Sequence, residues 1–463
     1  MIPMTIARVA EATGARPDRV LDLSALVTGP IVIDSRAAEP GALFAALPGE
    51  RTDGHNFATA AVAAGAVAVL ATRPVDGPAL IVADVPVAMA KLARALVDQL
   101  PKLEISGITG SAGKTTSKDL AAQLISGLGP TVYPKSSFNN EIGHPLTVLR
   151  ADADTRYLVL ELSARGPGHI ASLCEVAPPR LGVVLCVGSA HAGMFGGRDM
   201  IARAKGELPA ALPDDGVALL NADDPAVAAM AERTRARVAW FGRSERAEVR
   251  AADVALDQLG RPSFTLELPG GRARVALRLH GEHNVYNALA AAALAGELGM
   301  SVGEIADALS VAEPLSRWRM EVTQRPDGVI VVNDAYNASP EAMTAALRSL
   351  AVIAAGRRSF AVLGEMAELG GRSERFHEQA GREAARAGLT GLIVVGERAA
   401  PILAGAGSVA GFTGELIAVA DGGAALVEVR ERLRPGDVVL VKASHAIGLE
   451  AVAMALAAEG AGS

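Results

Sequence analysis

The sequence predicts an α/β protein of three domains built on mainly parallel sheets. Its 463 residues are too many for one hydrophobic core, and domains of roughly 150 residues make three the expected number. Apolar residues form 50% of the chain but aromatic residues only 3%, so Ala, Val, Leu and Gly must fill the interior. Apolar runs of strand length alternate with helical patterns, which is typical of parallel strands connected by helices.

The first block, residues 1–102, carries short helix and strand signals and ends in a helical run at 88–100 that Pro101 closes. The start of the chain lacks the basic segment and long apolar core of a signal peptide. The apolar run at 60–71 is too short and too rich in alanine to span a membrane. We therefore expect a cytoplasmic protein that is not embedded in a membrane.

Charge and cysteine content argue against two other classes of protein. The formal net charge of −7 disfavours a general nucleic-acid binder, which needs a basic face, so we expect no nucleic-acid partner. The two cysteines, Cys174 and Cys186, lie in unrelated contexts and predict neither a disulfide framework nor a zinc site.

The second block, residues 103–315, opens with an apolar run, the glycine-rich loop TGSAGKTT at 109–116, and a helical pattern. Glycines let backbone N–H groups face phosphate oxygens, the Lys114 ammonium can bridge the β- and γ-phosphates, and the Thr115 hydroxyl can bind Mg²⁺. The usual P-loop has Gly where this chain has Ile108, so an ordinary glycine-rich turn with a surface lysine remains the alternative. We predict that ATP phosphates contact Gly110, Ser111, Ala112, Gly113, Lys114, Thr115 and Thr116.

Polar residues end the strand-like runs at 157–165 and 181–191 of this block. Open parallel sheets bind their ligands at the carboxyl ends of strands. Glu161 is therefore a candidate Mg²⁺ ligand, because this ion prefers carboxylate, hydroxyl, phosphate and water oxygens. His191 is a second candidate, although a histidine at a strand end more often serves as a hydrogen-bonding loop residue.

Lys205 occupies an unusual place in the helical run 199–208, for which Asp199 is the expected N-cap. It shares the apolar stripe of Ile201 and Ala204. Burial favours a neutral amine, and a neutral amine can take up CO₂ to give a carbamate whose oxygens suit Mg²⁺. From periodicity alone, a lysine that extends its stem along the helix flank to solvent is the favoured explanation.

The third block, residues 316–463, alternates strand and helix signals and predicts a Rossmann-like parallel sheet. No GxGxxG follows its first strand, so dinucleotide binding is not indicated. The predicted strands lie at 328–337, 359–366, 391–397, 416–420 and 437–444, and the predicted helices at 340–351, 373–387 and 422–433.

Taken in order, these motifs resemble those of the Mur ligase family, the ATP-dependent amide-forming enzymes of peptidoglycan synthesis. The resemblance covers nearly the whole chain, and the family's own variant of the phosphate loop explains Ile108. It implies a UDP-substrate domain at 1–102, an ATP-binding domain at 103–315, and a Rossmann-like domain at 316–463 that closes on ATP and binds an incoming dipeptide. The matching segments are TGSAGKTT, SSFNNEIGHPLTVL (136–149), GSAHAGMFGGRDMIARAKGEL, NADDP, GEHNVYNALAAAALA (281–295), RMEV (319–322) and NDAYNASPEAMTAAL (333–347).

The third block separates two kinds of member within this family. The DNPR motif of the diamino-acid-adding member is absent, whereas DAYNASP and VLGEMAELGGRSERFHEQAG (362–381) are similar to the dipeptide-adding member. The resemblance therefore implies an enzyme that joins D-alanyl-D-alanine to a UDP-N-acetylmuramoyl-tripeptide, and we expect it to be a monomer. A Mur-type ligase with another acceptor, and a non-catalytic sensor of the muramoyl nucleotide, are the alternatives.

The resemblance also implies residue roles. Lys114, His191, Lys205 and Arg319 would be catalytic, with Thr115 and Glu161 on one Mg²⁺ and His191 and a carbamylated Lys205 on a second. ATP would contact Asn287 through adenine, Arg319 through the γ-phosphate and Asp334 through the ribose. The other substrates would contact Ser35, Arg36, Asn139, Asn140, Tyr336 and Asn337.

Three positions depart from the family pattern. His169 stands where Glu is common, and Ala443 and His445 stand where Gly and Arg are usual. The second pair lies near the expected acceptor pocket, so it bears on which dipeptide the chain accepts.

Overall fold

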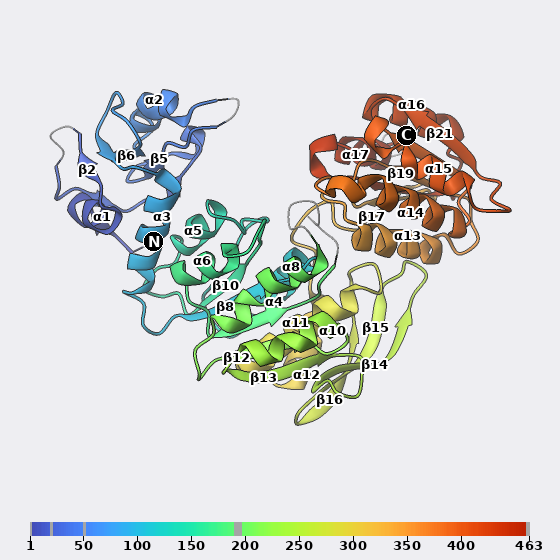
Figure 1. The fold of residues 1–463 in the computed structure, drawn as a ribbon, viewed down its shortest axis with the longest axis horizontal. Helices are drawn as coiled ribbons and strands as arrows, with labels where there is room; N and C mark the ends of the chain where they lie inside the picture. The colour runs from blue at the N-terminus through green and yellow to red at the C-terminus, as the bar shows by residue number, and fades with distance from the viewer. Residues whose placement is uncertain (1, 19–21, 50–51, 189–196, 460–463) are drawn as a thin grey trace.

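The computed structural model describes residues 2–18, 22–49, 52–188 and 197–459. It confirms the predicted α/β class with mostly parallel strands. The strands of the described residues form sheets of five, nine and six strands in chain order, beside a separate pair, β1 (Met4–Thr5) with β3 (Leu26–Val27). In Figure 1 the five-stranded and six-stranded sheets lie at opposite ends, and the nine-stranded sheet lies between and below them.

The N-terminal sheet has the order β2-β7-β6-β5-β4, with only β2 antiparallel. Helix α3 carries the predicted apolar run, with Asp84 as its N-cap, and packs on α5 of the next domain. It therefore joins the first domain to the second. The elements are α1 (Ile6–Thr13), β2 (Arg16–Pro17), β4 (Ile31–Val32), β5 (Leu43–Ala45), α2 (Ala58–Ala63), β6 (Ala68–Ala71), β7 (Ala79–Ile81) and α3 (Val85–Val97).

The central sheet has the order β16-β15-β14-β13-β12-β11-β8-β10-β9. Its strands are parallel from β9 to β14, and β15 and β16 add an antiparallel extension that the sequence patterns did not predict. The strands are β8 (Glu104–Thr109), β9 (Thr131–Val132), β10 (Tyr157–Glu161), β11 (Leu181–Val184), β12 (Val217–Asn221), β13 (Arg237–Gly242), β14 (Val249–Leu256), β15 (Pro262–Leu268) and β16 (Gly271–Ala276). The helices are α4 (Lys114–Ser126), α5 (Gly143–Val148), α6 (His169–Val176), α8 (Arg198–Lys205), α9 (Glu207–Ala210), α10 (Pro225–Ala228), α11 (Asn284–Glu297) and α12 (Val302–Val311).

Both faces of the central sheet are buried at β8, β10, β11 and β12, which explains the nearly continuous apolar runs of these strands. On β10, Leu158 and Leu160 point into the core on the side of α3, whereas Tyr157 and Val159 point into the core beneath α4 and α11. The buried sheet therefore gives the strand ends a rigid base.

The C-terminal sheet has the order β17-β18-β22-β19-β20-β21 and is parallel except for the edge strand β17. Helices α13, α14 and α15 cover one face, and α16 and α17 cover the other. All eight elements predicted in this block are present, and β17, α15 and α17 are additional. The elements are β17 (Glu321–Gln324), β18 (Ile330–Asn333), α13 (Pro340–Ala354), β19 (Ser359–Leu363), α14 (Ser373–Arg386), β20 (Gly391–Val395), α15 (Pro401–Gly407), β21 (Glu415–Val419), α16 (Gly422–Arg432), β22 (Val438–Lys442) and α17 (Glu450–Ala458).

Replacing two helical glycines by alanine should change the free energy of unfolding in opposite directions. A Cβ at Gly381 of α14 would lie 1.8 Å from the carbonyl oxygen of Ile402 in α15, whereas a Cβ at Gly303 of α12 meets open space. We expect Gly381→Ala to lower the free energy of unfolding by about 2 kcal/mol or more, through overpacking. We expect Gly303→Ala to raise it by up to about 1 kcal/mol, because Ala is the better helix former.

Chemical denaturation followed by circular dichroism measures both changes. A Gly381→Ala variant as stable as the parent chain would show that α14 and α15 do not approach each other as closely as the structure has them.

Candidate functional site

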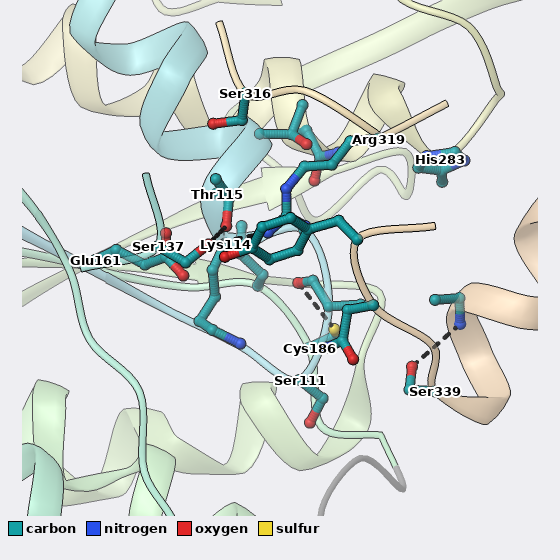
Figure 2. Close-up of a pocket in the computed structure, with 18 of the residues that line it drawn as sticks. Ser111, Lys114, Thr115, Ser137, Glu161, Cys186, His283, Ser316, Arg319 and Ser339 are labelled. Atoms are coloured by element: carbon teal, nitrogen blue, oxygen red, sulfur yellow. Dashed lines mark hydrogen bonds between the residues drawn. The ribbon is translucent and has the colours of Figure 1, made fainter. Parts of the chain in front are cut away.

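A pocket of about 570 Å³ lies where the carboxyl edge of the central sheet faces the C-terminal domain. The phosphate loop, Glu161 and the start of α11 line it from the central domain. The segment 313–320, which links the two domains, and residues from Asp334 to Ala345 line it from the other side. In Figure 2, Glu161, Ser137 and Thr115 lie side by side, and Arg319 reaches toward them from the linker. The two domains therefore share one site.

The phosphate loop follows β8 and ends where α4 begins at Lys114. Gly113 has φ +81°, and a Cβ there would lie 2.3 Å from Oδ1 of Asn287, so only glycine fits. The Asn287 amide is fixed from two sides: Ser117 donates to its Oδ1 at 3.2 Å, and its Nδ2 donates to Asn284 at 2.8 Å. The loop is thus held against α11.

Lys114 turns back onto its own loop, and its Nζ donates to the carbonyl oxygen of Gly110 at 2.8 Å. Burial lowers the pKa of the Lys114 ammonium, and the nearby Arg319 lowers it further, while Glu161 opposes both effects. Negative phosphate groups in the pocket would stabilise the charged form of Lys114, because they would supply the counter-charge that the buried ammonium lacks.

A single hydroxyl joins the phosphate loop to the C-terminal domain. Oγ of Ser137 lies 3.1 Å from Oγ1 of Thr115 and accepts a hydrogen bond from Nη2 of Arg319 at 3.0 Å. Sequence reasoning did not select Ser137, although it lies inside the quoted segment SSFNNEIG. The signal available was its place beside Asn139 and Asn140, both of which line the pocket.

Glu161 has the surroundings of a metal ligand. Its carboxylate is 1% exposed, Oε1 accepts a hydrogen bond from Nδ2 of Asn139 at 2.6 Å, and Oε2 is buried without a partner. A buried carboxylate oxygen without a partner is costly, and a bound cation would satisfy it. Within the described ranges, no three His, Cys, Asp or Glu side chains converge on one point.

Lys205 faces inward, as its periodicity predicts, and is 5% exposed. Burial and the positive charge of Lys114 lower its pKa to about 7. No carboxylate among the described residues forms an ion pair with it. The predicted N-cap is wrong: Gly197 precedes α8, and Asp199 lies in its first turn. His191 lies outside the described residues.

The backbone around Arg319 is strained and is held by the C-terminal domain. Trp318 and Met320 have φ of 60° and 52°, which non-glycine residues rarely adopt. The Met320 N–H donates to Oδ1 of Asp334 at 3.0 Å, and Oδ2 of Asp334 pairs with the Lys442 ammonium at 2.6 Å. Lys442, which sequence reasoning missed, is 1% exposed and ends β22. The sequence feature that could have revealed Lys442 is its place as a charged residue at the end of a buried parallel strand.

His445 belongs to an aromatic group next to the pocket. Its ring stacks on Tyr336 with centroids 5.5 Å apart and also lies 5.7 Å from Trp318. The Arg319 guanidinium lies 4.2 Å from the Tyr336 ring, so the arginine gains a cation–π contact. Ala443 is fully buried and does not line the pocket.

The remaining predicted residues fall into two sets. Asn140, Asn337, His169 and the loop residues from Ser111 to Thr116 line the pocket. Oδ1 of Asn140 also accepts the N–H of Gly143, the first residue of α5, at 2.9 Å. Ser35 and Arg36 lie in the N-terminal domain and do not line it, and Arg36 pairs with Asp34 at 2.6 Å.

Three family models match this chain in succession. The "Mur ligase family, catalytic domain" matches residues 30–105, the "Mur ligase middle domain" matches 108–295, and the "Mur ligase, glutamate ligase domain" matches 318–445. Together they span most of the chain, including the phosphate loop and Arg319.

Whole-chain relatives agree with the family models. A Mycobacterium bovis protein named UDP-N-acetylmuramoyl-tripeptide–D-alanyl-D-alanine ligase is 50% identical, over 99% of this chain and 98% of its own. The Escherichia coli protein of the same name is 34% identical, over 99% of this chain and 100% of its own. The structure of MurF from Acinetobacter baumannii superposes with a TM-score of 0.87 at 31% identity, covering 99% of both chains. MurF ligase from Thermotoga maritima in complex with ADP gives 0.80 at 30% identity, covering 94% of this chain and 98% of that one.

The Ser137 hydroxyl provides a direct test of this geometry. We expect Ser137→Ala to lower kcat by roughly tenfold, because both Thr115 and Arg319 lose the partner that orients them. The neighbouring Ser136 makes no hydrogen bond among the described residues and does not line the pocket, so Ser136→Ala is the matched control and should retain parental turnover. Phosphate release under saturating substrates measures both variants, and equal rates would remove Ser137 from the site.

Proposed function

The chain belongs to the Mur ligase family, and from that premise we propose that it joins D-alanyl-D-alanine to UDP-N-acetylmuramoyl-tripeptide with cleavage of ATP to ADP and phosphate. The observation that carries the proposal is a pocket lined by a phosphate loop, a buried carboxylate and Arg319 from the facing domain. It lies in a chain 50% identical, nearly end to end, to a ligase of that name. The product is a UDP-muramoyl-pentapeptide, a precursor of peptidoglycan.

The reaction proceeds in two transfers. The terminal carboxylate of the tripeptide attacks the γ-phosphorus of ATP, the bond to the β-phosphate oxygen breaks, and ADP leaves. The neutral amine of the dipeptide then attacks the acyl carbon of the resulting acyl phosphate. The tetrahedral intermediate collapses, the C–O bond breaks, and phosphate leaves with one oxygen of the original carboxylate.

The first transfer brings two anions together, so positive charge around them is the main requirement. In our proposal the loop amides and Lys114 hold the ATP phosphates, and Arg319 neutralises the γ-phosphate. Asn287 contacts adenine, and Asp334, which already accepts the N–H of Met320, contacts the ribose or nearby groups. Asn139 and Asn140 lie near the reacting carboxylate, and Tyr336 and Asn337 lie on the dipeptide side.

Magnesium fits the residues present, because a buried carboxylate oxygen of Glu161 lacks a partner. We propose Thr115 and Glu161 as ligands of one ion, and His191 and a carbamylated Lys205 as ligands of a second. When bound, Mg²⁺ supplies charge neutralisation between the carboxylate and the triphosphate. The pKa of about 7 at Lys205 supports the carbamate, because near neutral pH much of this amine is unprotonated.

The N-terminal domain completes the substrate site in this proposal. Ser35 and Arg36 bind the UDP end of the nucleotide, and the C-terminal domain closes on ATP and holds the dipeptide. Arg319 already contacts Ser137, so closure adjusts this part of the site rather than assembling it. None of the helices in the described ranges is long and apolar enough to cross a membrane. We place the reaction in the cytoplasm and expect a monomer.

Substrate dependence of phosphate release tests the function. We expect rapid release only when ATP, UDP-muramoyl-tripeptide and D-alanyl-D-alanine are all present, because the acyl phosphate turns over on the amine. Dipeptides with other residues form the comparison panel, since His445 next to Tyr336 bears on the acceptor. Phosphate release that does not change when any dipeptide is added would indicate a nucleotide sensor. Phosphate release that requires a different acceptor would indicate another Mur-type ligase.

Lys205 gives a separate test of the carbamate. We expect Lys205→Ala to abolish turnover and millimolar formate or acetate to restore part of it, because a small carboxylate replaces the lost oxygens. We also expect ¹³C-bicarbonate to give a carbamate signal in the parent chain that increases as pH rises through about 7, the pKa at which this amine becomes neutral. Absence of both rescue and signal would remove the carbamate from the mechanism.

A further inference from the structure

The linker that carries Arg319 runs from the end of α12 to the start of β17 and forms one wall of the pocket. Arg319 can act on ATP only if this linker leaves the central domain at the right point. The structure holds the linker at two places, one on each domain, and the two attachments differ in kind.

The first attachment is a side-chain clamp on the helix that begins at the phosphate loop. Nε2 of Gln123, on α4, donates to the carbonyl oxygen of Glu313 at 3.0 Å, and the Glu313 N–H donates to Oε1 of Gln123 at 3.0 Å. One amide side chain thus satisfies both backbone groups of one linker residue, much as a neighbouring strand would. Nε2 of Gln123 also donates to the Asp119 carbonyl at 3.0 Å, and the Glu313 carboxylate pairs with Arg278.

The second attachment fixes the far end of the linker to the C-terminal sheet. The Tyr336 N–H donates to the Trp318 carbonyl at 3.2 Å, and the Met320 N–H donates to Asp334. Among the described residues, 314–317 have no hydrogen-bond partner. These four residues therefore form the bending segment of the linker, whereas Trp318 and Met320, on either side of Arg319, are attached to the C-terminal sheet.

We propose that Gln123 is a positioning residue that fixes where the linker leaves the ATPase helix and so sets the reach of Arg319 to the γ-phosphate. The proposal rests on the proposed function in one respect, the action of Arg319 on ATP. Gln123 lies nine residues after Lys114 on the same helix, a rise of about 14 Å. The helix therefore carries the phosphate loop at one end and the origin of the linker near the other.

The clamp and the Ser137 contact act on the same guanidinium. Gln123 fixes the position of Glu313, where the linker begins, on α4. The hydrogen bond from Arg319 to Ser137 fixes the position of the guanidinium at the other end of the linker. Without the clamp, Glu313 gains freedom and the bending segment lengthens, so Arg319 spends less time in its productive position. ADP lacks a γ-phosphate, so its affinity should not depend on this clamp.

Two variants and one control test the proposal on the full chain. Gln123→Ala removes both hydrogen bonds, whereas Gln123→Glu keeps the acceptor for the Glu313 N–H and loses the donor to its carbonyl. Gln379→Ala is the control, because the Gln379 side chain bonds to Glu383 on its own helix and does not line the pocket. The readouts are hydrogen exchange at the Glu313 amide, kcat with saturating substrates, and the Kd of ADP.

For Gln123→Ala we expect faster exchange at Glu313, a kcat lower by roughly tenfold or more, and an ADP Kd within about twofold of the parent. The exchange rate at Glu313 and the kcat of Gln123→Glu should lie between those of the parent and those of Gln123→Ala. Gln379→Ala should match the parent in all three readouts. Faster exchange at Glu313 with unchanged kcat would overturn the proposal, as would equal losses in kcat and ADP affinity. A parent chain without dipeptide-dependent phosphate release would instead refute the proposed function, and the exchange data would still report on the clamp.

Discussion

One hydroxyl group, that of Ser137, lies between a residue that can hold Mg²⁺ and a residue that can neutralise the γ-phosphate. The chemistry requires positive charge on both sides of an attack by one anion on another. In this chain one side comes from the phosphate loop and the other from the domain that follows it. The strained backbone around Arg319 and its attachment to Asp334 serve the same end, because they hold the guanidinium toward the central domain.

The electrostatics of the pocket follow from burial. Burial lowers the pKa of Lys114 and of Lys205, and the positive charge of Lys114 lowers the pKa of Lys205 further. Burial therefore favours the neutral form of Lys205. In the proposed function, phosphate binding by Lys114 and CO₂ uptake by Lys205 both depend on the burial of these two amines.

The sequence predicts those parts of the fold and site that depend on local pattern. The phosphate loop is recognisable because strand, glycines, lysine and helix are contiguous, and Glu161 because it ends a buried strand. The contacts of Ser137 and Lys442 instead join residues that are distant in the sequence and close in the fold, so no local pattern reveals them. Lys442 meets Asp334 across 108 residues of sequence.

The burial of Lys205 also could not be predicted from the sequence pattern alone. Periodicity alone favours a side chain that reaches solvent, and only packing of its helix decides the matter. The N-cap of α8 and the antiparallel extension β15–β16 escaped prediction for a similar reason, because glycine and edge strands carry weak patterns.

In the proposed function the substrate carboxylate attacks the γ-phosphorus of ATP in this pocket. The most direct measurement uses tripeptide nucleotide labelled with ¹⁸O in its terminal carboxylate, followed by mass analysis of the released phosphate. The acyl-phosphate route predicts one ¹⁸O in each phosphate formed from doubly labelled carboxylate, because the C–O bond breaks when the amine attacks. Unlabelled phosphate, formed at the same rate as the amide product, would contradict the claim.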